Sequence, residues 1–160
     1  MPSVTIEYVI LIPLLFTQVI VFPLVASTMT SNWQSSQRNI ELQDTANHLA
    51  STIQQLYLTI NGVDVLECTV TQISPLPFTI ASYPYTATAS LSPSDGSART
   101  LTVTLVMDDV GNTVSTSTVL GTNVNDWVDS TPLRSTSTGA YISVQKFSNN
   151  TISFRFGGSD

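Results

Sequence analysis

The stretch from Val4 to Ala26 reads VTIEYVILIPLLFTQVIVFPLVA and decides the fold of this chain. Its only charged residue is Glu7, and the next charged residue along the chain is Arg38. As an α-helix the stretch would be about 35 Å long, which is enough to cross the hydrocarbon core of a bilayer. Because it is apolar on all sides, we expect lipid or protein to enclose it.

Two ordinary interpretations of such a stretch fit it poorly. A secretory signal peptide begins with a basic region, but the only charge here is acidic, and Leu24-Val25-Ala26 is a weak cleavage site. An ordinary membrane anchor normally has Lys or Arg beside the span on its cytoplasmic side, and neither end of this stretch is basic close by. An unpaired carboxylate inside an apolar run is costly, so Glu7 predicts a partner for its charge.

The helical pattern continues beyond Ala26. A stripe of apolar residues recurs in alternating steps of four and three, which is typical of an amphipathic helix with one packed face. Its members are Leu42, Ala46, Leu49, Ile53, Leu56 and Ile60. Trp33 and Ile40 are expected to extend the same face. Asn61-Gly62 is a natural helix stop, since both residue types tolerate a left-handed conformation.

Pro13 and Pro23 are the only helix breakers in this region, and no Gly or Pro occurs from residue 24 to residue 60. Each proline removes one backbone hydrogen bond, so we expect each to bend or locally melt the helix.

After Gly62 the sequence changes to alternating β-branched and small polar residues, which is typical of short strands. The predicted strands are Val63–Ile73, Phe78–Leu91, Leu101–Met107, Thr113–Leu120, Tyr141–Phe147 and Thr151–Phe156. Residues 108–112 and 148–150 have the composition of hairpin turns. Residues 123–139 have the least pattern and are expected to form a long loop.

These patterns predict an α+β fold, with a long N-terminal apolar helix followed by a small antiparallel β-sandwich or barrel. The helix is expected over residues 1–61, with 1–30 as filament core or membrane segment and 31–61 packed on the globular domain. The β domain is expected over residues 62–160. Its predicted core residues are Leu101, Val103, Leu105, Ile142, Val144, Ile152 and Phe154.

Composition excludes several classes of function. Only 10% of the residues are charged, the formal net charge is −6, and there is no cluster of Lys or Arg of the kind that binds nucleic acid. Ser and Thr make up about a quarter of the chain, so the surface is expected to be polar without being charged. The single cysteine, Cys68, rules out an internal disulfide. We interpret it as a small buried residue in a strand, with an inter-subunit disulfide as the alternative.

No catalytic or metal-binding motif is present, so the chain is not expected to be an enzyme or to hold a cofactor. The only histidine, His48, has no other metal-ligand residues clustered near it and is interpreted as a surface or hydrogen-bonded residue. The carboxylates of Asp108 and Asp109 could bind calcium only if further oxygen ligands lay around the same ion. A plain turn is the simpler interpretation. Asp126 and Asp129 are interpreted as solvated loop charges.

One modification motif occurs. Asn149-Asn150-Thr151 satisfies the Asn-x-Thr rule in a predicted surface turn, so Asn149 is a candidate for N-glycosylation if the protein is exported. The Ser/Thr-rich surface also permits O-glycosylation.

The run from Val4 to Phe16 resembles the N-terminal signature of type IV pilins. It is most similar to the pilin-like proteins of tight-adherence systems and to archaeal pilins. In that family a Glu lies a few residues into the mature chain, an aromatic or apolar residue follows, and an apolar helix continues; Glu7 and Tyr8 fit this order. Pro13 matches the tight-adherence type in its distance from Glu7, and Pro23 lies where many pilins have a helix kink. No basic leader ending in Gly precedes the run, so we expect Met1 to begin the mature form.

The resemblance implies a structural subunit that self-assembles into an extracellular filament for adhesion or surface attachment. It implies storage in the cell membrane, extraction by a pilus assembly machinery, a filament core made of apolar helices, and pairing of Glu7 with the N-terminal amine of a neighbouring subunit. The charge-poor β domain fits archaeal pilins better than bacterial ones. The alternatives are a membrane-anchored extracellular β-domain protein, and a minor pilin that does not form the bulk of a filament.

Overall fold

The computed structural model describes residues 3–74, 76–93, 96–128 and 132–159, with side chains from residue 9 to residue 158 within these ranges. The chain divides into two compact units, residues 1–37 and residues 38–160, each of which is described by itself. One helix, α1 (Ser3–Ile60), provides all of the described part of the first unit and the beginning of the second. The strands of the second unit are β1 (Cys68–Ile73), β2 (Tyr85–Leu91), β3 (Thr100–Met107), β4 (Thr113–Val119), β5 (Val124–Trp127), β6 (Leu133–Arg134), β7 (Thr138–Lys146) and β8 (Ile152–Ser159).

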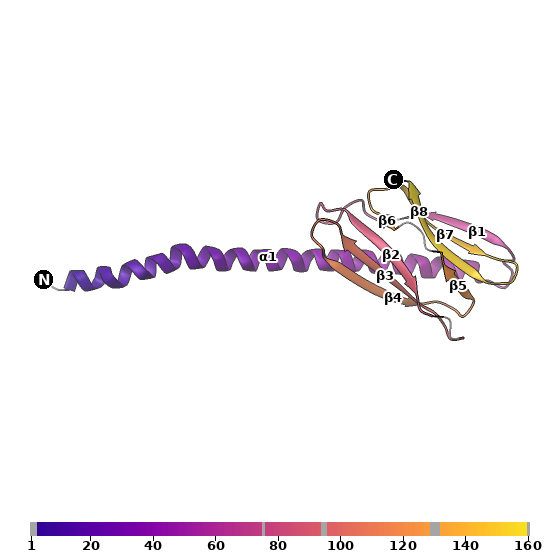
Figure 1. Cartoon of the computed structure of the whole chain (residues 1–160), viewed down its shortest axis with the longest axis horizontal. Helices are drawn as coiled ribbons and strands as arrows, with labels where there is room; N and C mark the ends of the chain where they lie inside the picture. Colours follow the sequence, from indigo (N-terminus) through magenta and orange to yellow (C-terminus); the bar gives the residue numbers. More distant parts are fainter. Residues whose placement is uncertain (1–2, 75, 94–95, 129–131, 160) are drawn as a thin grey trace. The chain divides into compact units, whose positions relative to one another are not determined.

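The strands form two four-stranded sheets, in the orders β1-β7-β8-β5 and β4-β3-β2-β6 (Figure 1). Neighbouring strands pair in the antiparallel sense, except that β5 runs parallel to β8. Hairpins join β3 to β4 and β7 to β8, at the two turns that composition predicted. The predicted α+β fold, an apolar N-terminal helix followed by a small, mainly antiparallel β-sandwich, is therefore confirmed.

Both sheets share one hydrophobic core with the second half of α1. Every member of the predicted helix stripe is buried, at 0–6% exposure, and every predicted core residue of the strands is buried, at 0–1% exposure. Polar contacts add to this packing, since Thr116 of β4 donates a hydrogen bond of 2.8 Å to the side chain of Asn47. Thr45 and Thr52 are also buried, and each satisfies its hydroxyl on the backbone carbonyl four residues earlier.

Trp33 and Ile40 do not extend the buried face, contrary to the prediction, because they are 65% and 52% exposed. At about 100° per residue, positions nine and two residues before Leu42 lie about half a turn away from it around the helix. The prediction was wrong because it continued the stripe with spacings that do not fit the helical period.

The helix ends at Ile60, immediately before the predicted stop. The stop does not use a left-handed residue, because neither Asn61 nor Gly62 is among the described residues with positive φ. Instead the Asn61 N–H donates to the carbonyl of Tyr57 at 2.8 Å and closes the last turn.

Several predicted boundaries were wrong, by the largest margin at β1, at β2 and in the predicted loop. β1 begins at Cys68, because residues 62–65 form a turn closed by a hydrogen bond of 3.2 Å from Val65 to Gly62. β2 begins at Tyr85, because the chain reverses before it at Ala81 and Ser82, whose φ angles are 48° and 71°. The predicted loop over residues 123–139 contains β5, β6 and the start of β7, of which β5 and β6 are too short to show a period-two pattern.

Candidate functional site

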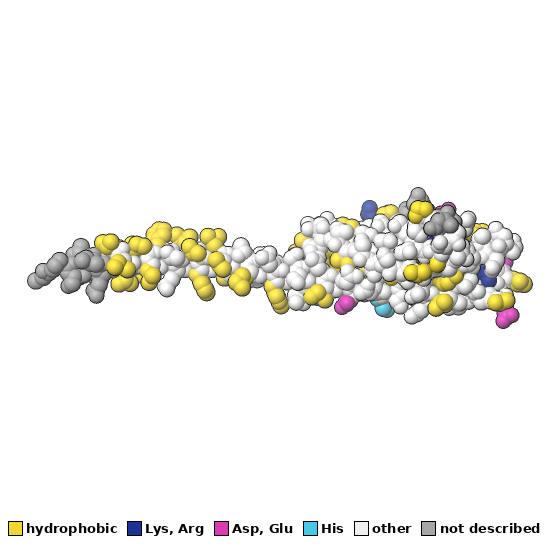
Figure 2. Space-filling model, turned by 90° about the horizontal axis from the view of Figure 1, so that it is seen from below, with side chains coloured by type: hydrophobic (Ala, Val, Ile, Leu, Met, Phe, Trp, Pro, Cys, Tyr) yellow, Lys and Arg dark blue, Asp and Glu magenta, His cyan; other side chains and the backbone are white. Residues whose placement is uncertain are grey.

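The apolar surface of α1 in the first unit is the most unusual feature of the described chain. Its large hydrophobic side chains from residue 9 to residue 25 are exposed by 45–73%. They are Val9, Ile10, Leu11, Ile12, Leu14, Leu15, Phe16, Val19, Ile20, Val21, Phe22, Leu24 and Val25. Figure 2 shows these apolar side chains projecting along the helix. Soluble monomers rarely expose so large a continuous apolar surface, so we expect lipid or other protein chains to cover this part of the helix.

The same helix is long and apolar enough to cross a membrane. Its most apolar 18-residue window has a mean hydropathy of 2.5, and none of that window is buried within the chain itself. The helix is therefore compatible with membrane anchoring.

Hydroxyl groups in this part of α1 bond back to the helix itself. Thr17 donates to the carbonyl of Pro13 at 2.8 Å, Thr30 to that of Ala26 at 2.9 Å, and Ser31 to that of Ser27 at 3.0 Å. Such bonds satisfy a hydroxyl without water, which is the requirement in lipid or in a dry helical core.

The two prolines lie inside a continuous helix. α1 includes both Pro13 and Pro23, so neither of them melts it. Proline has no N–H, and the carbonyls of Val9 and Val19 therefore lack the donor that a residue four positions later normally provides. Glu7 lies in α1 by its backbone, but its side chain lies outside the described residues, so its predicted pairing stays a prediction.

The other predicted residues lie on separate elements of the second unit. His48 is exposed on α1, and Asp108 lies in the β3–β4 turn, where it accepts a hydrogen bond of 2.8 Å from Thr86. Asp126 lies in β5 instead of the predicted loop, and Asp129 lies outside the described residues. Within the described ranges, no group of three or more His, Cys, Asp or Glu side chains could hold a metal ion.

Cys68 is a free, half-buried residue at the start of β1, where it packs against the edge of the core. It is less buried than predicted, because β1 is an edge strand of its sheet and has a neighbour only at β7.

Asn149 lies exposed in the turn between β7 and β8. Its side-chain oxygen accepts hydrogen bonds from the backbone N–H of Thr151 at 3.1 Å and from the Thr151 hydroxyl at 2.6 Å. Asn150 between them has a φ of 65°, a conformation that Asn tolerates better than most residues. The turn therefore presents the candidate glycosylation residue on the surface, with its amide tied to the Thr of the same motif.

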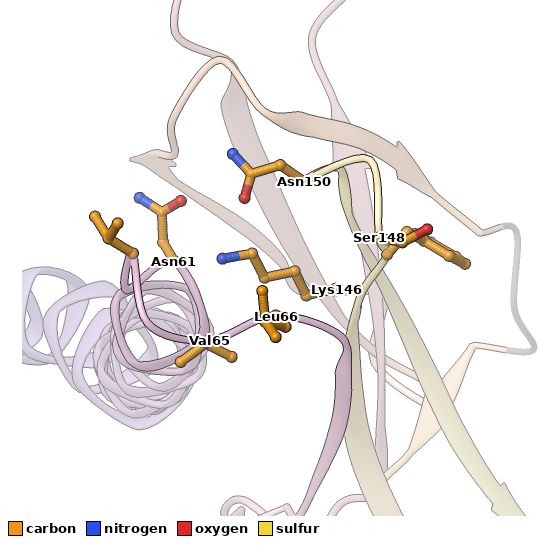
Figure 3. Close-up of a pocket in the computed structure, with 8 residues that line it drawn as sticks. Asn61, Val65, Leu66, Lys146, Ser148 and Asn150 are labelled. Atoms are coloured by element: carbon orange, nitrogen blue, oxygen red, sulfur yellow. The ribbon is translucent and has the colours of Figure 1, made fainter.

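A pocket of about 320 Å³ lies at the end of α1 and contains a buried lysine that the sequence analysis missed (Figure 3). Lys146 of β7 is only 3% exposed, and its Nζ donates a hydrogen bond of 3.0 Å to the carbonyl of Gly62. A signal was present in the sequence, because alternation along the strand places Lys146 on the same face as Ile142 and Val144, both predicted to be in the core.

Comparison of the chain with protein-family models, with curated proteins and with solved structures finds no match in any of the three. These comparisons assign no family to the chain, and its resemblance to type IV pilins stays a prediction from the N-terminal residues.

Proposed function

We propose that this chain is a structural subunit that self-assembles through its apolar N-terminal helix into an extracellular filament like a type IV pilus. In this proposal the chain carries out no reaction. The subunit is stored in the cell membrane before assembly. A pilus assembly machinery then transfers it into a polymer that serves adhesion or surface attachment.

The observation that carries the proposal is the uncovered apolar surface of α1 from Val9 to Val25, which has no charged residue and no polar face. A membrane covers such a helix with lipid, and a bundle of identical helices covers it equally well with protein. The surface is thus suited to both environments that a pilin occupies in turn.

The second unit supports the proposal through the kind of surface it offers. The outer face of the β3–β4 ladder carries small hydroxyl side chains, with Thr104 and Ser115 hydrogen-bonded across the strands at 2.9 Å. Such a face is polar but uncharged, so copies of the domain can lie side by side without like-charge repulsion. The charge-poor domain also favours an archaeal type of pilin over a bacterial one.

Glu7 distinguishes a filament subunit from a membrane-anchored β-domain protein, which is the second candidate because the helix is compatible with a single membrane span. In a filament the carboxylate needs a partner on a neighbouring subunit, whereas an anchor has no use for it. A minor pilin would share the need for Glu7 but would be scarce in the filament.

The test is the variant Glu7→Gln, with Glu41→Gln as the matched control. Both substitutions remove one carboxylate from α1, but Glu41 is exposed in the second unit, beyond the apolar segment. We expect Glu7→Gln to be expressed and inserted in the membrane without forming filaments, and Glu41→Gln to assemble normally. Filaments of normal number and length from Glu7→Gln would overturn the pairing role.

A further inference from the structure

The first strand of the β domain has one unpaired edge. β1 lies at the end of its sheet, with β7 on one side and no described strand on the other (Figure 1). Its six residues contain no charge and no proline, and they pair with β7 in a regular register without a bulge. Thr69, Thr71 and Ile73 are exposed, Ile73 by 76%. An edge of this kind is a template on which another strand can pair.

The strands at the other sheet ends, β5, β6 and β4, are protected. β5 has only four residues, carries Asp126 and has an irregular register with β8. β6 has only two residues and includes Arg134. β4 is longer, but α1 lies beside it, since Thr116 of β4 donates to Asn47 of the helix at 2.8 Å. Short length, charge, bulges and a covering helix all hinder strand addition, so β1 is the most available edge among the described strands.

The direction of the backbone groups shows what this edge offers. The Ser74 N–H, just after β1, donates to the Ala140 carbonyl at 2.8 Å, in continuation of the β1–β7 register. Backbone groups in an antiparallel ladder alternate in direction from residue to residue, so the even-numbered residues of β1 bond to β7. The odd-numbered residues, Thr69, Thr71 and Ile73, therefore direct their N–H and C=O groups to the open edge. Each of them offers one donor and one acceptor there.

We propose that β1 pairs in the antiparallel sense with β1 of a second copy of the chain. Thr71 lies opposite Thr71 of the second copy, and Thr69 lies opposite Ile73. In this register every outward N–H and C=O of one edge meets its complement on the other, because the outward residues are placed symmetrically about Thr71. A shift by one residue sets outward groups against residues that bond to β7, and a shift by two leaves one end unmatched. The edge is thus complementary to itself.

The charge beside β1 does not oppose this pairing. Glu67 is the residue immediately before β1, and β1 itself is uncharged. In the proposed register the two Glu67 residues lie at opposite ends of the paired strands, roughly 26 Å apart at about 3.3 Å per residue. That distance exceeds the Debye length of about 8 Å at physiological salt, so their repulsion is screened. The exposed Ile73 side chain gains a cross-strand neighbour in Thr69 of the second copy. The pairing uses the second unit alone and does not rest on filament formation.

Cysteine cross-linking of the full chain in membranes tests the register, with Cys68→Ser as the background of every variant. We expect Thr71→Cys chains to form disulfide dimers under mild oxidation, because the paired Cα atoms would lie about 5.5 Å apart, within the range for a disulfide. Thr69→Cys is the matched control, since it is exposed on the same strand but its two copies would lie about 13 Å apart. We expect about tenfold less dimer from it, because that separation is too long for a disulfide. Equal dimer yields from the two variants, or no dimer from Thr71→Cys, would overturn the proposal.

Two mixing experiments complete the test. Thr69→Cys and Ile73→Cys chains should form few dimers alone and should cross-link when they are mixed, since these positions face each other in the proposed register. Failure of the mixed pair to cross-link would contradict the register. Thr71→Cys chains mixed with Ser115→Cys chains, whose cysteine lies exposed on β4, distinguish the two longer edges as partners. Cross-links between positions 71 and 115, in place of those between two positions 71, would overturn the pairing of β1 with itself.

Discussion

The hydroxyl of Tyr57, in the last turn of α1, donates a hydrogen bond of 2.9 Å to the side-chain oxygen of Asn123. The Asn123 amide in turn donates to Asn61 at 2.7 Å, so one asparagine ties the end of the helix to the segment before β5. Gly121 makes room for this contact, because a Cβ atom there would lie only 1.8 Å from the Tyr57 hydroxyl oxygen. The position of the helix end on the sheets is therefore held by specific polar contacts as well as by the apolar core.

Replacing Tyr57 by Phe tests this relationship. The variant leaves the Asn123 oxygen without its donor in a partly buried place, and we expect a loss of about 1–2 kcal/mol in the free energy of unfolding. Tyr83→Phe is the control, since the Tyr83 ring contacts Arg38 through its face, at 5.0 Å from the ring centroid, and keeps that contact without the hydroxyl. Denaturant unfolding of both variants in the same detergent measures the difference. Equal stability of the two would show that the Tyr57 hydroxyl contributes nothing.

Stability should also depend on pH through Tyr85. Its side chain is fully buried, its hydroxyl donates to the Pro77 carbonyl at 2.7 Å, and burial raises the pKa of this hydroxyl well above its ordinary value. Below the ordinary pKa of about 10 both folded and unfolded chains keep the proton. Above it the unfolded chain ionises first, so stability is lost as pH rises towards the folded pKa.

The variant Tyr85→Phe isolates this effect. It should be less stable than the wild type at neutral pH, because it lacks the bond to Pro77, and its stability should fall less steeply above pH 10. Unfolding free energies from pH 7 to 11 measure the two slopes. Parallel curves for the two proteins would contradict the assignment.

Asn149 is predicted to carry an N-linked glycan in native material. Its turn is exposed, and the Thr151 hydroxyl that the acceptor motif requires lies 2.6 Å from the Asn149 side-chain oxygen. Mass spectrometry of the peptide that contains residue 149 should show an added sugar mass, and Thr151→Ala should abolish it. Finding only the unmodified peptide in native material would contradict the prediction of a glycan on Asn149.

A charge placed within the apolar segment should prevent both membrane insertion and assembly. Phe16 is 65% exposed, and an Asp near the middle of a spanning helix costs about 3 kcal/mol. We expect Phe16→Asp to be depleted from carbonate-washed membranes, whereas Ser36→Asp, at an exposed polar position of the same helix beyond residues 1–30, behaves like the wild type. Full retention of Phe16→Asp in the membrane would mean that this segment is not the part covered by lipid.

The sequence predicted the features that depend on long regular patterns. The stripe from Leu42 to Ile60 repeats over many turns, and the alternation around Val103 runs through a whole strand, so helix, core and fold class could be inferred. β5 and β6 could not, because they contain four and two residues and depend on pairing with β8 and β2, which lie far away in the sequence.

The candidate sites divide in the same way. The apolar surface of α1 is a local property and was predicted from Val4 to Ala26 directly. The pocket at Lys146 was not, because it needs the end of α1 and the β7–β8 turn in one place, although residues 62 and 146 are 84 positions apart. Only the inward position of Lys146 in its strand could have indicated it.

The central claim is that the apolar segment of α1 assembles with the same segment of other copies into the core of a filament of identical chains. Electron microscopy of material sheared from the cell surface, with mass spectrometry of its composition, tests it most directly. The account predicts thin filaments in which this chain is the main protein and the helices from Val9 to Val25 form the core. Recovery of the chain only from detergent-extracted membranes, with no filament that contains it, would contradict the account.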